Sequence, residues 1–230
     1  MKTIGILGGM SWESSAQYYA LINQGVRERL GGIASAKILM HSVEFSEMAR
    51  MQAAGEWDAL GAQLGEAAAG LEQVGAEVML IATNTMHLVA PAVEAAISIP
   101  LLHIADPLGA ALKQAGHDRV GLLATRFTME QPFYAERLAT HGVEVVTPGE
   151  ADRTELHRII FEELCAGEVC ETSQAFAHGL IEDLKRQGVP AIALACTELM
   201  LLIDPEHSAL PLFDTTALHC QAAVDFAFSA

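Results

Sequence analysis

The sequence predicts an α/β fold made of two similar Rossmann-like lobes. Three observations support this prediction: apolar runs that alternate with helical segments, strands that are apolar along nearly their whole length, and a weak internal repeat. Near-continuous apolar strands are typical of parallel sheets that helices cover on both faces. With 230 residues, 51% of them hydrophobic, the chain is long enough for one large core or two modest ones.

The first half of the chain contains four apolar runs that we expect to form strands. Helical segments separate most of them, as the crossovers of a parallel sheet require. The expected strands are 3–7, 36–41, 77–82 and 100–103, and the expected helices are 14–30, 58–74 and a short helix after Thr85. The segment 103–107 is the expected crossing into the second lobe.

The second half resumes this order. The expected strands are 119–124, 143–146 and 191–195, and the expected helices are 128–140, 153–166, 172–187 and a last one from Thr215. Residues 2–9 resemble 118–125 at an offset of 116, and 78–85 resemble 191–198 at an offset of 113. We therefore predict two lobes: residues 1–104, with the helix 214–230 packing back on them, and residues 105–213.

The carboxyl ends of the predicted strands are the expected ligand-binding positions, because ligands in open parallel sheets bind there. Strand ends from both lobes would line a cleft between them, and we expect the active site in that cleft. The residues at these ends are 8–11, 83–85, 124–128 and 196–198.

Composition excludes several classes of partner. The chain carries 13 Lys and Arg against 29 Asp and Glu, with no basic run for nucleic acid or an anionic membrane surface. No segment approaches the ~18 apolar residues of a membrane span, and the N-terminal apolar run is too short for a signal peptide, so we expect a cytoplasmic protein. The four cysteines form no C-x-x-C pair and the histidines no ligand spacing, which predicts reduced thiols and no metal site.

Cys196 is the candidate reactive group, because it follows a predicted strand and precedes a segment that can begin a helix. The positive end of a helix dipole would favour thiolate over thiol there. Thr197 adds a hydroxyl, and Glu198 is a candidate acceptor for a substrate ammonium. The alternative for Cys196 is packing alone, which we expect for the other three cysteines.

Cofactor chemistry receives little support from the sequence. The glycine loop reads G-x-x-G-G over residues 5–9, not the G-x-G-x-x-G of dinucleotide sites, and no lysine is placed as pyridoxal phosphate would require. These glycines are better suited to a close approach of the backbone to a small anion such as a carboxylate. His87 and His103 lie near strand ends and are candidates to reach the cleft, although such histidines are commonly structural.

Five motifs are spread over almost the whole chain: IGILGGMSWES at 4–14, TNTMH at 83–87, LATRFT at 123–128, ACTE at 195–198 and FDT at 213–215. Together they resemble the aspartate/glutamate racemase family of cofactor-independent amino-acid racemases. The resemblance implies two lobes related by a pseudo-twofold axis, no cofactor and a homodimer. It also implies that a cysteine from each lobe acts on opposite faces of the α-carbon, as inversion requires.

The first lobe departs from that pattern, because Thr83 stands where the family has its first cysteine. A threonine hydroxyl is far less acidic than a thiol, so we expect Cys196 to deprotonate one enantiomer well and the reverse direction to be impaired. Arg50 and Arg126 are two open candidates for the side-chain carboxylate. The resemblance implies these substrate-binding residues: Met10, Ser11, Gln52, Asn84, Thr85, Thr125, Thr128, Thr197 and Glu198.

The favoured hypothesis is a pyridoxal-phosphate-independent racemase of aspartate or glutamate, with Cys196 and Thr83 on opposite faces of the substrate. One alternative is a single-cysteine enzyme of the same superfamily, a maleate isomerase or an arylmalonate-decarboxylase-like protein. A racemase of broader specificity and a non-catalytic amino-acid-binding module are the others. Glu198 and Asn84 suit an ammonium-bearing substrate better than a bare dicarboxylate, and binding alone does not need a thiol.

Overall fold

The computed structural model describes residues 1–229, which form two compact α/β units. The first unit contains Met1–Ile104 and the chain from His219 onward, and the second contains Ala105–Leu218. Each unit has one sheet whose strands pair in parallel, which confirms the predicted α/β class. The chain leaves the first unit after Ile104 and re-enters it within its last helix.

The sheet of the first unit has the strand order β2-β1-β3. β1 (Ile4–Gly8) and β3 (Val78–Ile81) are buried along their whole length, whereas β2 (Ile38–Ser42) is an edge strand with three exposed residues. Leu101 adds a parallel bridge to Met79 on the remaining edge of β3. The ladder therefore supplies the hydrogen bonds that buried backbone groups need.

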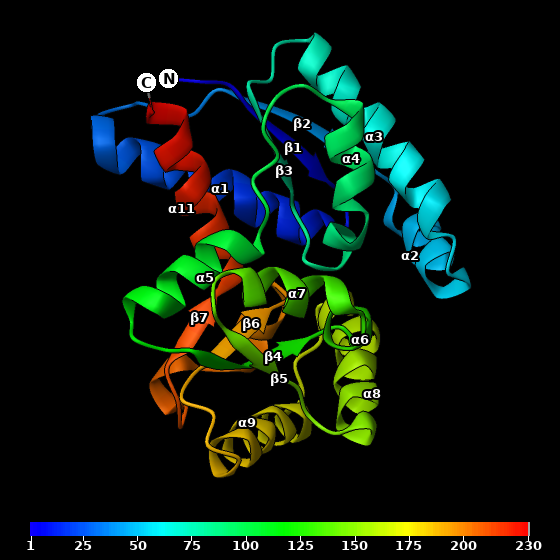
Figure 1. Ribbon diagram of the computed structural model, residues 1–230, viewed down its shortest axis with the longest axis vertical. Coiled ribbons are helices and arrows are strands. Elements are labelled where there is room, and N and C mark those ends of the chain that lie inside the picture. The colour runs from blue at the N-terminus through cyan, green and yellow to red at the C-terminus, as the bar shows by residue number, and fades with distance from the viewer. Residues whose placement is uncertain (230) are drawn as a thin grey trace. The chain divides into compact units, whose positions relative to one another are not determined.

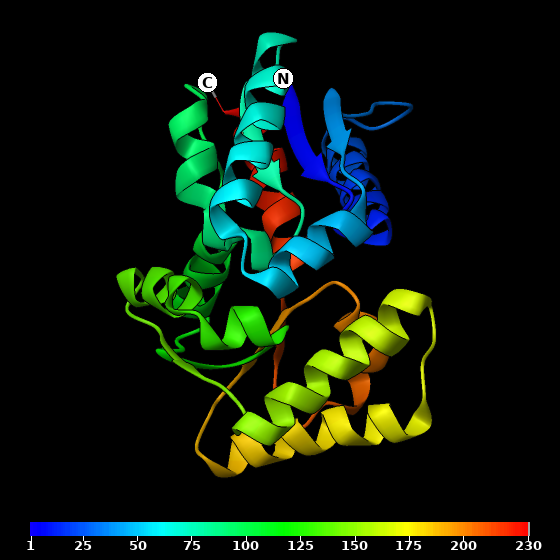
Figure 2. The same cartoon turned by 90° about the vertical axis from the view of Figure 1, so that its right-hand side faces the viewer.

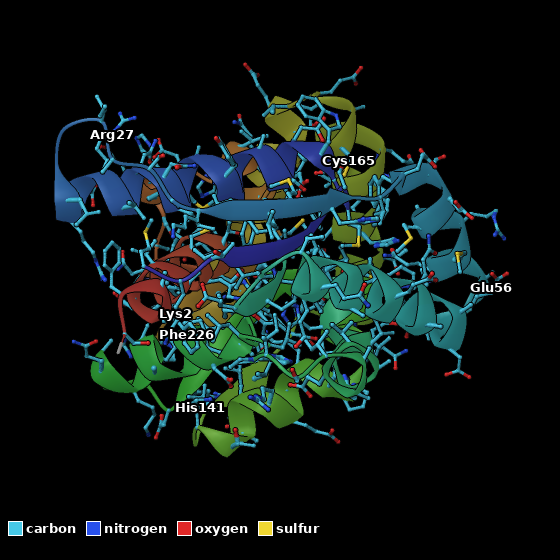
Figure 3. All side chains as sticks on the ribbon, turned by 90° about the horizontal axis from the view of Figure 1, so that it is seen from above. Lys2, Arg27, Glu56, His141, Cys165 and Phe226 are labelled. Atoms are coloured by element: carbon cyan, nitrogen blue, oxygen red, sulfur yellow. The ribbon has the colours of Figure 1, made fainter. Side chains whose placement is uncertain are left out.

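Helices cover both faces of this sheet (Figure 1). On one face α1 and α11 pack against β1 and β3, and on the other α2, α3 and α4 do so. Near the N-terminus, Nζ of Lys2 lies 4.6 Å from the ring centroid of Phe226 in α11 (Figure 3). The helices are α1 (Trp12–Leu30), α2 (Phe45–Ala54), α3 (Trp57–Gln73), the 3₁₀ helix η1 (Thr85–Val89), α4 (Ala90–Ala96) and α11 (Thr215–Phe228).

The sheet of the second unit has the strand order β5-β4-β6-β7. β4 (Arg119–Ala124) and β6 (Ile192–Ala195) form its buried centre, and β5 (Glu144–Val146) and β7 (Leu212–Asp214) form its partly exposed edges. β7 pairs with β6 as Leu101 pairs with β3, so the two sheets share one strand order.

The helices of the second unit include α8 and α9, and the chain continues from α8 through η2 and η3 before a loop at residues 167–170 leads into α9 (Figure 2). The Ser173 hydroxyl of α9 donates a hydrogen bond of 2.6 Å to Oε2 of Glu163. Across residues 1–229, every helix is too short or too polar to cross a bilayer. The helices of this unit are α5 (Ala105–Gln114), α6 (Arg126–Glu130), α7 (Pro132–Thr140), α8 (Glu150–Arg158), the π-helix η2 (Ile159–Glu163), η3 (Leu164–Ala166), α9 (Glu171–Arg186), α10 (Leu199–Leu202) and η4 (Pro205–His207).

The observed elements differ from the sequence-based expectations in several places. The strand expected over 100–103 is only a single bridge at Leu101, and the helix expected over 153–166 is α8 followed by η2 and η3. The helix expected over 128–140 is wrong as a single element: it is divided into α6 and α7, because Pro132 has no N–H to continue α6 and instead begins α7. The elements α2, α5 and β7 were not expected. The segment expected as the crossing, 103–107, enters α5, and Pro107 lies in the first turn of that helix, where proline is tolerated.

The strand pairing within each sheet follows the internal repeat of the sequence. Gly5 pairs with Met79 in the first unit, and Gly121 pairs with Ile192 in the second. These four residues are related by the same two offsets as the repeat, 116 and 113. Thr83 and Cys196 therefore occupy equivalent positions beyond the third strand of their respective units.

We expect Gly9→Ala to destabilise the protein. Gly9 has φ +90°, and a Cβ there would lie 2.3 Å from the carbonyl oxygen and 2.5 Å from the nitrogen of Val43. Backbone strain and overlap with backbone atoms should lower the free energy of unfolding by about 2 kcal/mol or more.

The matched control is Gly70→Ala in α3. Gly70 is exposed, and no atom lies within 4 Å of an added Cβ, so helix propensity should raise stability by about 0.5–1 kcal/mol. Urea unfolding measures both variants. Equal stability of Gly9→Ala and the wild type would contradict the strain argument.

Candidate active site

The turn after β3 presents Thr83, Asn84 and Thr85 at the carboxyl end of the first sheet. Asn84 and Thr85 are buried, while Thr83 keeps partial exposure. The Thr83 hydroxyl makes no hydrogen bond with any residue of the described chain, 1–229. Within residues 1–229, no group is therefore positioned to accept its proton.

His87 is buried in the same turn, and both of its ring nitrogens are bonded to backbone. Nδ1 lies 2.8 Å from the Thr83 carbonyl oxygen, and Nε2 accepts the Ile104 N–H at 3.1 Å. Burial, with smaller contributions from His103 and His219, holds the pKa of His87 well below its ordinary value. His87 is thus a neutral, fully bonded ring and is not placed to exchange protons with a substrate.

The glycine loop between β1 and α1 carries Met10 and Ser11. The Ser11 hydroxyl caps α1 by accepting the Ser14 N–H at 3.2 Å. The Ser15 hydroxyl accepts the Gly9 N–H at 2.7 Å and donates to the Ser11 carbonyl at 3.0 Å. Met10 is buried in the apolar core of the first unit, so the loop is held both by packing and by hydroxyl groups.

Gln52 is a buried polar side chain near this turn, with only 4% of its surface exposed. Its Nε2 lies 3.0 Å from Sδ of Met86, and its side chain makes no other hydrogen bond within residues 1–229. A thioether is a weak acceptor. Most of the hydrogen-bonding capacity of this amide is therefore available for a ligand.

The second unit places Cys196, Thr197 and Glu198 after β6. Oε2 of Glu198 accepts a hydrogen bond from the Cys196 thiol at 3.0 Å and another from the Thr197 hydroxyl at 2.7 Å. Glu198 is itself 9% exposed, so its charge acts in a poorly solvated environment. The thiol consequently has a carboxylate oxygen in direct reach of its proton.

The expectation that a helix dipole favours the Cys196 thiolate is wrong for this arrangement. α10 begins only at Leu199 and is four residues long. Burial, followed by the negative charge of Glu198 and the hydrogen bond to it, raises the pKa of Cys196 well above its ordinary value. Burial first, and the nearby carboxylate second, therefore favour the protonated thiol of Cys196.

Thr125 and Thr128 lie at the corresponding turn after β4. The Thr125 side chain caps α6 by accepting the Thr128 N–H at 3.4 Å, and the two hydroxyl oxygens are 3.2 Å apart. Thr125 thus has the same local role after β4 that Ser11 has after β1. Both units place a hydroxyl-capped helix after the first strand of the repeat.

Neither of the two arginines that were candidates for binding the substrate's side-chain carboxylate is buried. The Arg50 side chain is 63% exposed and faces Glu56 at 3.4 Å. Arg126 is 44% exposed, and its Nε lies 3.9 Å from Oε2 of Glu130. Both guanidinium groups are bound to surface carboxylates.

Sequence reasoning missed two buried residues connected to this region, Tyr18 and His219. The Tyr18 hydroxyl lies 2.8 Å from Nδ1 of His219, and Nε2 of His219 lies 2.8 Å from the Leu102 carbonyl. The three residues are far apart in the chain, so no local pattern marks the contact. The sequence signal for His219 is a polar ring beside the apolar residues of α11.

Comparison with known proteins identifies a family over most of the chain. Residues 7–223 match the family model described as Asp/Glu/hydantoin racemase. The broad-specificity amino-acid racemase RacX of Bacillus subtilis (strain 168) is 26% identical over 161 residues, covering 69% of this chain and 68% of RacX.

Two solved structures match over their full lengths and over this full chain. A candidate Asp/Glu racemase from Yersinia pestis is 50% identical, with a TM-score of 0.93. An aspartate racemase homologue from Pyrococcus horikoshii OT3 is 32% identical, with a TM-score of 0.86.

We expect Glu198→Gln to make Cys196 more reactive toward alkylation. The amide removes the negative charge that opposes thiolate formation, so the pKa of Cys196 should fall and the thiolate fraction should rise at a given pH. Iodoacetamide labelling between about pH 6 and pH 10, resolved by peptide mass spectrometry, should show labelling several-fold faster at neutral pH. Unchanged or slower labelling at Cys196 would mean that Glu198 does not control its ionisation.

We also expect a pH-dependent loss of stability that originates at His87. Its pKa is depressed in the folded state, so below about pH 6.5 the unfolded chain takes up a proton that the folded ring does not. The free energy of unfolding should therefore fall as the pH decreases from 8 to 5. The rings of His103 and His219 face His87 and add to the depression of its pKa.

Urea unfolding of the wild type and His87→Gln across this pH range isolates the contribution of His87. The variant should show a shallower fall in stability. His41→Gln, a change at an exposed histidine of the same unit, is the control and should keep the wild-type slope. Parallel curves for His87→Gln and the wild type would rule out a buried neutral ring.

Proposed function

The chain belongs to the Asp/Glu/hydantoin racemase family, and from this we propose that it racemises aspartate or glutamate without pyridoxal phosphate. The observation that carries the proposal is the contact between the Cys196 thiol and the Glu198 carboxylate at the end of β6. A thiol with a carboxylate acceptor is a suitable acid-base group for the α-carbon of an amino acid.

The proposed first step is abstraction of the α-proton by Cys196. The thiol proton passes to Oε2 of Glu198, 3.0 Å away, and the resulting thiolate takes the α-proton. The electron pair of the C–H bond remains on the substrate as a carbanion stabilised by its carboxylate. We assign Glu198 to the thiol proton rather than to the substrate ammonium, because Oε2 already accepts from Cys196 and Thr197.

The proposed second step is protonation of the opposite face on the side of Thr83. Thr83 and Cys196 hold equivalent positions in the strand register of their units. The Thr83 hydroxyl would pass a proton from solvent water to the carbanion, so that it is not left as an alkoxide, and the proton held by Glu198 returns to solvent. Because no base in the described chain adjoins Thr83 to assist the removal of a proton, we propose a higher kcat from the L than from the D enantiomer, with KM differing in the same proportion, since the enantiomers have equal free energy.

Further polar groups are proposed to hold the substrate. Gln52 is the best supported, since its buried amide has only a thioether as partner. Asn84, Thr85 and Thr197 are proposed for the α-carboxylate or amine, with Met10 and Ser11 as the floor of the site. Thr125 and Thr128 are proposed for a carboxylate.

A single-thiol reaction is the second candidate. It is favoured by one observation, namely that no base within residues 1–229 adjoins the Thr83 hydroxyl. In that case Cys196 would exchange the α-proton of an amino acid on one face only, or would deliver a proton to the carbanion that a decarboxylation leaves.

Incubation with L-aspartate or L-glutamate in D₂O separates the two candidates. Two-sided transfer gives the D enantiomer with deuterium at Cα, whereas a single thiol gives deuterated L-substrate. Starting from the D enantiomers, we expect the same exchange at a lower rate. NMR follows the α-proton, and chiral chromatography follows the configuration.

Cys196→Ser should reduce turnover by about 100-fold or more, because a hydroxyl replaces the thiol base. Cys170→Ser makes the same change at another thiol of the second unit and should keep nearly full activity. Absence of exchange by the wild type with every acidic amino acid tested would refute the proposed function.

A further inference from the structure

We propose that His87 is a positioning residue for the turn that carries Thr83, and that His219 holds the backbone segment to which His87 is bonded. This inference rests on the proposed racemase function and extends it to two side chains that do not contact the reacting atoms. Geometry within the first unit supports it.

The hydrogen bonds of His87 determine its tautomer. The Ile104 N–H can only donate, so Nε2 must present its lone pair. Nδ1 then carries the proton and donates it to the Thr83 carbonyl at 2.8 Å. Each hydrogen bond uses a different ring nitrogen. A single neutral imidazole therefore connects the turn that carries Thr83 to Ile104.

Ile104 belongs to a short segment that His219 also holds. The Leu102 carbonyl can only accept, so Nε2 of His219 carries a proton and donates it there at 2.8 Å. Nδ1 of His219 accepts from the Tyr18 hydroxyl at 2.8 Å. Leu102 is further fixed by its N–H, which donates to the Met79 carbonyl of β3 at 3.0 Å.

These bonds form one path through buried groups. It runs from Tyr18 to His219, along the backbone from Leu102 to Ile104, and through His87 to Thr83. Tyr18 and His219 have no exposed surface, and His87 is 1% exposed. Water has little access to replace a lost bond, so each bond restricts the conformation of its neighbours.

Ring packing restricts the path further. The centroid of His87 lies 4.6 Å from that of His103 and 5.9 Å from that of His219. A ring enclosed in this way has little freedom to rotate about χ2. The Thr83 peptide is consequently held in one orientation relative to β3.

The path also includes the two residues of the first unit at which the chain passes into and returns from the second unit. Ile104 is the last residue before the chain enters the second unit, and His219 is the first after it returns. Each crossing is thus secured by a histidine bonded to backbone. A loosened bond at His87 would shift the orientation of the Thr83 side chain, and displacements of about 1 Å reduce rates by about 100-fold.

Two substitutions of His87 each preserve one of its two hydrogen bonds and remove the other. In His87→Asn the side-chain amide can reproduce the Nδ1 donor to the Thr83 carbonyl but does not reach Ile104. In His87→Gln the longer side chain can accept from the Ile104 N–H and loses the bond to Thr83. His207→Gln, at an exposed histidine of the second unit, is the matched control.

The readout is a product ratio measured with L-aspartate in D₂O: D-product formed, divided by L-substrate that returns with deuterium. Protonation on the Thr83 side increases this ratio, whereas the sum of both species reports deprotonation by Cys196. His87→Gln should lower the ratio by about ten-fold or more and change the sum by less than about three-fold. His87→Asn should restore most of the ratio.

A general structural role would instead lower the sum and leave the ratio unchanged in both variants, and that result would overturn the inference.

An inactive wild type would refute the proposed racemase function. The hydrogen bonds of His87 can then still be tested by NMR, which does not depend on activity. The imidazole ¹⁵N shifts of His87 should report a neutral ring protonated at Nδ1. The Ile104 amide should lose exchange protection in His87→Asn and keep it in His87→Gln; an Nε2-protonated or charged ring would overturn the inference.

Discussion

Parallel pairing between fully buried strands is the constraint on which the rest of the structure depends. β1 and β3 in one unit, and β4 and β6 in the other, have almost no exposed residues. Such strands satisfy their backbone polar groups only through the ladder, and their side chains must be apolar. Polar groups can therefore appear only where the strands end, and parallel strands end at one edge of each sheet.

The two units share a helix cap after their first strand and differ in the reactive side chain after their third strand. After the first strand of each repeat, a hydroxyl caps a helix: Ser11 in one unit and Thr125 in the other. After the third strand, the second unit provides a thiol bonded to a carboxylate, whereas the first provides a hydroxyl with no hydrogen bond in the described chain. The difference in acidity between the two groups makes the two proton transfers of the proposed reaction unequal in rate, even though the sheets of the two units share one strand order.

Much of this architecture could be predicted from the sequence, because long apolar runs determine where buried strands lie. The Ile4–Gly8 and Arg119–Ala124 strands match the expected ranges to within a residue at each end. Shorter elements such as β7 have too few residues to establish a pattern. The residues that follow the strands were identifiable as candidates from their positions alone.

The electrostatics and the long-range contacts of the site could not be predicted in the same way. Glu198 is visible in the sequence beside Cys196, but only a side-chain conformation brings its oxygen to the thiol and reverses the expected direction of the pKa shift. His87 reaches Ile104, 17 residues away, and His219 reaches Leu102 across more than a hundred. Contacts between residues so distant in sequence depend on the completed fold.

The route of α11 has a consequence for how the protein is made. The core of the first unit includes Cys220, Ala223, Val224 and Ala227, and the Lys2 N–H donates to the Ala227 carbonyl at 2.8 Å. During translation these residues leave the ribosome after the entire second unit. The face of the β1–β3 sheet on which α1 and α11 pack is thus covered by α1 alone on the nascent chain until α11 has been made, whereas the second unit, encoded without interruption, has all of its own core available earlier.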